Sequence, residues 1–290
     1  MPLIILLPIL GVVLLLRRIG RLTDSMAILN AVSALILLLY IGALLGFMRH
    51  TAFSLTGIGL LLLIYELRSL KRLGKFPLTT PILLFIFIPV IYWLIHSESR
   101  PLFWDEYSHW GIYVREMVST HQLWSIETNS VHPNYPPGTA IWQYFFTMIS
   151  GYDEGTVYLA QFVLLITPLL VLFENISRRQ FLWIPAVLAM LALGLSNFGH
   201  GIVSLYTDHI LGVWYAGILL QGLQSHPERP KVMGLLSLPM AVLLLIKDAG
   251  LPLVTSAMAF LLLLLVYRRF REKGWIQLNR TLIIVILVLW

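Results

Sequence analysis

The chain has 290 residues, of which 58% are hydrophobic and only 12% are charged, and its mean hydropathy is +0.84. This composition is too apolar for a soluble globular domain and far too apolar for a disordered chain. Cysteine is absent, which excludes disulfides, thiolate metal sites and cysteine nucleophiles. We therefore predict an all-α, polytopic integral membrane helix bundle that sits in a lipid bilayer.

Apolar runs divide the chain into three parts. Residues 1–95 hold about four spans, residues 96–155 form a long hydrophilic loop, and residues 156–290 hold about five spans and a partial one. The runs are 2–16, 26–47, 52–67, 78–95, 156–173, 181–195, 201–220, 233–246 and 251–267, with a tenth from Leu282. A crossing helix needs roughly 20 residues. The tenth run stops at Trp290, so we expect a C-terminally truncated piece of a longer protein.

The net charge of +6 would suggest nucleic acid in a soluble protein, but here the basic residues follow the topology. If successive connections lie on alternate sides, one side holds every Lys and Arg except Arg49, Arg100, Arg115 and Lys247. Because basic loops stay in the cytoplasm, the loop 96–155 is predicted to be extracytoplasmic. We expect no nucleic-acid partner.

The loop 96–155 holds half of the chain's 14 acidic residues, so it is the natural place for a polar substrate. A solvated, tryptophan-anchored connector is the alternative. Within the loop, one apolar stripe predicts an amphipathic helix in the headgroup layer. Residues 139–150 are predicted to form a second short helix. The stripe consists of Phe103, Tyr107, Trp110, Val114 and Met117.

Polar residues in this loop suggest a site. Asp105 and His109 are four residues apart and share a helix face, and Asp105 and Glu106 follow the fourth span directly. Such carboxylates can act as a general base or meet a phosphate through a metal ion. The proline-rich segment from His132 to Gly138 is stiff, so it either holds His132 and Tyr135 toward a site or forms a plain turn.

Three further ionisable residues lie on the same predicted side. Asp208 marks the outer end of the seventh span, and Lys247 and Asp248 lie between the eighth and ninth. Charges at such depth are functional candidates, and a lone lysine suits a phosphate. A structural ion pair of Lys247 with Asp248 or Asp208 is the alternative. Motifs for nucleotide binding, zinc proteolysis and serine hydrolysis are missing.

In this order, the residues resemble the bacterial GT-C superfamily of membrane glycosyltransferases, near the dolichyl-phosphate-mannose-protein-mannosyltransferase-like proteins. The pattern runs from Trp104-Asp105-Glu106 and Trp110 through His132-Pro-Asn-Tyr135-Pro-Pro to Tyr206-Thr-Asp208 and Lys247-Asp248-Ala-Gly250. It covers about residues 103–251 and implies a GT-C-like fold whose extracytoplasmic loop bears two interfacial helices. The acidic pair follows the fourth span, whereas many members place that pair after the first span, so three further spans precede it here.

The resemblance implies an inverting transferase in the bacterial inner membrane. It would move a sugar from a polyprenyl-phosphate donor to a glycan, lipid or protein acceptor on the outer face. Asp105 would be the catalytic base with Glu106 as its partner, and His109, His132, Tyr135, Asp208, Lys247 and Asp248 would bind substrate. No cofactor is certain, and a divalent metal on Asp105, Glu106 or His109 stays open. A transporter or flippase and a non-catalytic subunit of glycan assembly are the alternatives.

Overall fold

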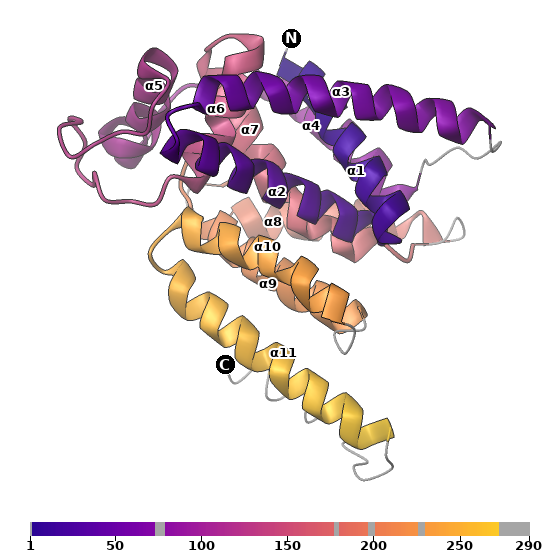
Figure 1. Ribbon diagram of the computed structural model, residues 1–290. Helices are drawn as coiled ribbons and strands as arrows, with labels where there is room; N and C mark the ends of the chain where they lie inside the picture. Colours follow the sequence, from indigo (N-terminus) through magenta and orange to yellow (C-terminus); the bar gives the residue numbers. More distant parts are fainter. Residues whose placement is uncertain (1, 73–78, 177–179, 197–200, 226–229, 273–290) are drawn as a thin grey trace.

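A computed structural model describes residues 2–72, 79–176, 180–196, 201–225 and 230–272, and every regular element within these ranges is a helix (Figure 1). The longer helices are α1 (Leu6–Gly20), α2 (Asp24–Leu44), α3 (Met48–Arg72), α4 (Thr80–His96), α7 (Glu154–Ile166), α8 (Trp183–Ser196), α9 (Asp208–Gln224), α10 (Pro230–Ile246) and α11 (Gly250–Glu272). The shorter ones are η1 (Pro2–Ile5), η2 (Glu106–Trp110), α5 (Gly111–Thr120), α6 (Gly138–Ser150) and η3 (Thr167–Phe173). The predicted all-α class is confirmed.

Length and apolarity identify the helices that can cross a bilayer. Five qualify, namely Pro2–Gly20, Asp24–Leu44, Met48–Ser69, Glu154–Phe173 and Gly250–Arg271. Three shorter apolar helices are Thr80–His96, Trp183–Gly194 and Val232–Ile246. The chain is thus a helical membrane protein, with five rather than nine or ten helices of spanning length among the described residues. The tenth predicted run lies outside them.

The predicted span 201–220 is wrong in its first third. Helix α9 begins only at Asp208, because backbone groups of the residues before it form hydrogen bonds with side chains of other segments. The Leu205 N–H donates to the Glu106 carboxylate, and the Tyr206 carbonyl accepts from the Gln161 side chain. These bonds hold residues 204–207 at the end of the bundle instead of inside a helix.

Polar side chains tie helix ends together at one end of the bundle. Arg17 pairs with Asp24 at 2.8 Å, and Arg18 pairs with the buried Glu66 at 2.8 Å. The Glu174 carboxylate accepts the first N–H groups of α2, where the helix dipole favours negative charge. The ends of α1, α3 and η3 and the start of α2 therefore meet, as expected if connections alternate between two sides. We call the other end of the bundle, which carries α5 and α6, the site end.

Helices α1 and α3 cross with their backbones in contact. A Cβ atom on Gly11 would lie 2.0 Å from the Gly59 carbonyl oxygen, and one on Gly59 would lie 2.5 Å from the Pro8 carbonyl oxygen. Small residues permit this approach, which drives helix association in lipid through dispersion. The crossing fixes α1 and α3 directly against each other.

The crossing predicts different outcomes for two glycines of α3. Gly59→Ala should destabilise the protein by about 1–3 kcal/mol because the added methyl forces the helices apart. Gly57→Ala should be neutral or stabilising, because a Cβ there meets nothing within 4 Å and alanine favours helix. Thermal unfolding in detergent measures both. Equal melting temperatures for the two variants would contradict the crossing.

Proline explains the change of helix type after α7. Pro168 has no N–H, so the Leu164 carbonyl four residues earlier loses its helical donor. The Trp214 indole of α9 supplies that hydrogen bond at 3.0 Å. Gly217, one turn further along α9, packs directly on Pro168. Thus α9 is docked against η3, which places its first turn at the site end.

Helix α6 lies in the core, so its predicted interfacial position is wrong. Trp142, Tyr144, Phe145 and Phe146 are fully buried, because the helix is apolar on most of its circumference and packs against several neighbours. At its start, a Cβ on Gly138 would lie 2.6 Å from the Leu245 carbonyl oxygen. The proline-rich segment is therefore anchored beside the end of α10, close to Lys247.

Candidate functional site

A single wide turn sets the orientation of the acidic segment. The Gly111 N–H donates to the Glu106 carbonyl, five residues back rather than four, and a Cβ on Gly111 would lie 2.7 Å from that oxygen. Such π-turns rotate the following side chains relative to a regular helix. As a result Glu106 and His109 are buried, whereas Tyr107 is exposed.

The predicted interfacial stripe is therefore wrong. Trp110, Val114 and Met117 are buried in the protein rather than in the headgroup layer, and α5 packs on α6. Tyr107 lies outside their face because of the π-turn. Helix α5 is amphipathic as predicted, but its apolar side covers the bundle.

Glu106 joins two segments that are far apart in sequence. Its side chain is buried, with 1% exposed. One carboxylate oxygen accepts the Leu102 and Phe103 N–H groups at 2.8 and 3.1 Å, and the other accepts the Leu205 N–H at 2.7 Å. Hydrogen bonds to a buried carboxylate are strong. Glu106 thus fixes both the loop that carries Asp105 and the segment that leads into α9.

Asp105 remains half-exposed beside Tyr206. The Tyr206 ring contacts the Phe103 ring at a centroid distance of 6.1 Å. Burial and the negative charge of Asp105 both raise the pKa of Tyr206, so its phenol stays protonated. Asp105 is therefore a partly exposed carboxylate that interacts with a neutral hydroxyl.

His109, His132 and Tyr135 form an aromatic cluster. The His109 ring lies 5.1 Å from the His132 ring and 5.5 Å from the Tyr135 ring, and His132 stacks on Tyr135 at 4.6 Å. Ser108 Oγ lies 2.8 Å from His109 Nδ1. The stiff segment thus brings His132 and Tyr135 to His109, as one of the two sequence interpretations expects.

Two aromatic residues that sequence reasoning missed support this cluster. The Tyr113 hydroxyl donates to the His132 carbonyl, and the Trp124 indole donates to the Pro133 carbonyl at 2.8 Å. Their rings stack on each other at 3.9 Å. The density of aromatic residues in the loop was the only signal for them.

Burial lowers the pKa of His109 to about 4. The charge of Asp105 acts in the opposite direction, while the charges of His132 and Lys247 lower the pKa further. His109 is therefore neutral at pH 7, and it lies within the electric field of Lys247, the residue that follows α10. The interactions connect the acidic segment, the proline-rich segment and the end of α10.

A pH titration should reveal the neutral His109. Because its pKa in the folded chain lies below the ordinary value of about 6.5, unfolding takes up a proton between these two values. Stability should therefore fall as the pH drops from about 6.5 to about 4 and level off below. Thermal unfolding of His109→Phe should show a shallower slope in this range, whereas His132→Gln should keep most of it. Identical slopes for His109→Phe and wild type would contradict the assignment.

Asp208 and Lys247 form the ion pair of the site. Lys247 Nζ lies 2.6 Å from Asp208 Oδ1, and the Asp208 side chain is more than half exposed. Asp248 is exposed, and its carboxylate has no hydrogen bond or ion pair within the described ranges. Of the two pairs considered from sequence, the structure has Asp208 with Lys247. Asp248 is the next residue after Lys247 and faces solvent.

Two glutamines inside the bundle form a chain of hydrogen bonds that ends at the backbone of Tyr206. The Gln143 amide donates to the Gln161 side chain at 2.9 Å, and the Gln161 amide donates to the Tyr206 carbonyl at 3.0 Å. Both glutamines are buried. Sequence reasoning missed them, because isolated glutamines inside apolar runs have no distinctive spacing.

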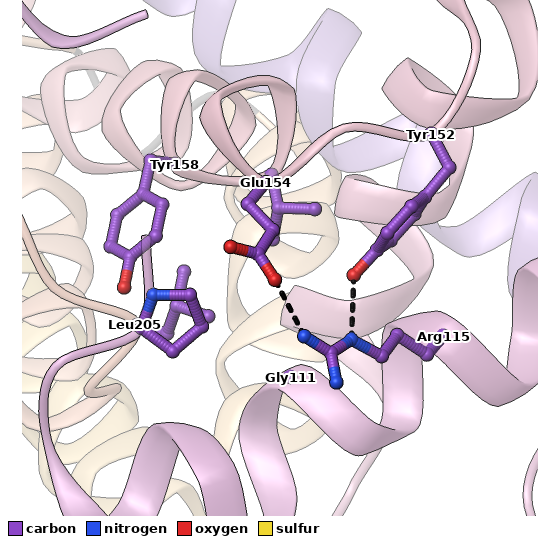
Figure 2. A pocket seen from close by; sticks show the side chains of 8 residues that line it. Gly111, Arg115, Tyr152, Glu154, Tyr158 and Leu205 are labelled. Carbon is purple, nitrogen blue, oxygen red and sulfur yellow. Dashed lines mark hydrogen bonds and ion pairs between the residues drawn. The ribbon is translucent and has the colours of Figure 1, made fainter. Parts of the chain in front are cut away.

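A small pocket lies behind the acidic segment, between α5 and α7 (Figure 2). Arg115 of α5 donates to the Tyr152 hydroxyl at 3.0 Å and to the Glu154 carboxylate at 2.5 Å. Leu205 and Tyr158 also line this pocket. These contacts hold α5 against the start of α7, so the pocket is part of the support of the site.

A metal site in the described part of the chain would need several ligating side chains close together. No group of three His, Asp or Glu side chains there is arranged to hold an ion. Of the three sequence candidates, Glu106 already accepts three backbone N–H groups and His109 Nδ1 contacts Ser108. Asp105 is half-buried and interacts with the Tyr206 hydroxyl.

Comparisons with protein-family models, with curated proteins and with solved structures found no match.

Proposed function

We propose that the protein is a membrane transferase that uses a lipid-linked phosphate substrate, and more narrowly a glycosyltransferase of the GT-C type. Its donor would be a polyprenyl-phosphate sugar and its acceptor a glycan, lipid or protein at the outer face of a bacterial inner membrane. One observation carries the proposal. The carboxylate of Asp105 and the ammonium group of Lys247 lie at one end of an apolar helix bundle, where both charges act on the pKa of His109.

Asp105 and Lys247 have separate roles in the reaction. A hydroxyl oxygen of the acceptor attacks the anomeric carbon of the sugar, while the bond from that carbon to the phosphate oxygen breaks with its electron pair. Asp105 takes the hydroxyl proton as general base. Lys247 binds the phosphate that leaves, where a cation stabilises the growing charge. Attack opposite to the leaving phosphate inverts the anomeric centre.

The remaining residues position these groups. Glu106 orients the Asp105 loop through backbone hydrogen bonds, and is therefore a positioning residue in this proposal. His132 and Tyr135 offer hydrogen-bonding groups to a sugar. Asp248 is exposed next to Lys247. The mechanism assigns no step to a divalent metal, because the three sequence candidates do not form a set of open ligands.

A transporter for a lipid-linked saccharide is favoured less. Transport sites usually lie near the membrane midplane between repeated halves. Here the ion pair of Asp208 and Lys247 lies where α9 begins and α10 ends. A non-catalytic subunit would share the fold but not the turnover, so only an activity measurement separates it from the transferase.

Binding of polyprenyl phosphate tests the part assigned to Lys247. Lys247→Ala should weaken binding about 10- to 100-fold, because one hydrogen bond between charged groups is worth about 1.5–3 kcal/mol. Asp208→Asn should strengthen binding, because it frees the lysine from its partner. Equilibrium binding of labelled polyprenyl phosphate in detergent measures both. If the pair is only structural, both variants lower the melting temperature and neither changes the Kd.

A further inference from the structure

Three large apolar side chains are exposed around Asp105. Leu102 and Trp104 are each 76% exposed, and Tyr107 is 54% exposed. We call these three residues the apolar edge. Two other residues of the same short segment, Glu106 and His109, are buried, so the segment has one face in the protein and one face outside it.

The apolar edge follows a membrane helix closely. Phe87, Ile91, Leu94 and Ile95 of α4 are all exposed, and their spacing places them on one face of that helix. In a bilayer this face lies against lipid. The apolar edge begins only six residues after α4 ends at His96, so it lies at the depth where the hydrocarbon meets the headgroups.

The residue types suit that layer. Tryptophan and tyrosine favour membrane interfaces, where one part of the ring is apolar and another is wet. The Tyr107 hydroxyl already donates to the Pro101 carbonyl, which leaves its ring free to contact acyl chains. The exposed Arg100 beside them matches anionic headgroups.

We infer that the apolar edge is embedded in the lipid at the site end, and that substrates reach Asp105 sideways from the bilayer. The second half of this inference rests on the proposed function, whereas the first half does not. The occupant of the apolar edge is the headgroup and upper acyl region of membrane lipids. The segment thus presents a carboxylate at the level of a lipid-linked phosphate.

The absence of native cysteine allows a direct test. Trp104→Cys and Ile126→Cys each receive an environment-sensitive fluorophore in nanodiscs of phosphatidylethanolamine and phosphatidylglycerol. Ile126 is the matched control, because it is 81% exposed but lies between Ser125 and Glu127 in the distal part of the loop. We expect lipids with a shallow spin label to quench position 104, and iodide to quench position 126.

Two outcomes would overturn the inference. Iodide quenching at position 104 equal to that at position 126 would place the apolar edge in water. Shielding of position 104 from both quenchers would mean that a protein, such as a second copy, covers it. Because neither readout needs turnover, these failures are separate from a failure of the proposed function.

Steady-state kinetics test whether substrates reach Asp105 sideways from the bilayer. Trp104→Ala should raise the KM for a long-chain polyprenyl-phosphate sugar at least several-fold with little change in kcat, and Trp104→Phe should restore it. A water-soluble donor with a short chain should show no such increase. An equal increase for both donors would contradict sideways access, and shallow quenching without any donor consumption would remove the proposed function alone.

Discussion

Asp105→Asn should reduce sugar transfer by about 10²- to 10⁴-fold, the usual contribution of a general base. Asparagine has nearly the same shape but cannot take the proton of the acceptor hydroxyl. The fold should persist, because the Asp105 carboxylate is half-exposed and its neighbour Glu106 makes the structural hydrogen bonds. Release of free polyprenyl phosphate measures the rate, and thermal unfolding confirms the fold.

Glu127→Gln is the matched control for Asp105→Asn. It changes an exposed carboxylate of the same loop, so it alters net charge equally without touching the site. We expect its transfer rate to equal that of wild type. Normal turnover by Asp105→Asn would contradict the assignment of the base.

Glu106→Ala should have the largest effect on stability. It would leave three N–H groups without their acceptor, two part-buried ones before η2 and a buried one before α9. An unpaired buried donor costs about 1–3 kcal/mol and the part-buried donors add less, so we expect a loss of about 3 kcal/mol in the free energy of unfolding. Activity should fall with it, because the Asp105 loop and the start of α9 lose their connection.

The control for Glu106→Ala is Glu98→Ala, which removes an exposed carboxylate from the same connection and should leave the melting temperature unchanged. Glu106→Gln should be intermediate, because one oxygen remains as acceptor. If Glu106→Ala abolished transfer at an unchanged melting temperature, Glu106 would act in the chemistry itself, as the sequence resemblance implies.

The helices could be predicted because lipid imposes simple rules. Long apolar runs must form helices to satisfy their backbone groups, and the runs at 26–47 and 52–67 match α2 and α3 closely. The run at 201–220 failed because its first residues are apolar but bonded to side chains of other segments. Hydropathy does not record such tertiary bonds, so the start of α9 was placed too early.

The orientation of the acidic segment could not be predicted. A regular helical period places Tyr107 with Trp110 and exposes Glu106, whereas the π-turn that ends at Gly111 reverses this. One extra residue in one turn is invisible to a periodicity argument. The same turn explains why the apolar edge differs from the stripe expected from sequence.

The gathering of the site residues was predicted in part. Ordered motifs on one predicted side suggested that His109, His132 and Lys247 belong together, and the ring contacts and the pKa of His109 agree. The choice of Asp208 over Asp248 as the partner of Lys247 could not be made, because it depends on how α9 meets α10. Long-range contacts of this kind need the fold.

The central claim is tested most directly by turnover of wild type in liposomes that contain polyprenyl-phosphate sugars and mixed bacterial envelope lipids and glycans as acceptors. We expect free polyprenyl phosphate to accumulate with transfer of the labelled sugar, and both to depend on Asp105. Liposomes in which no donor of a broad sugar set is consumed would contradict the transferase and leave the subunit or transport interpretations.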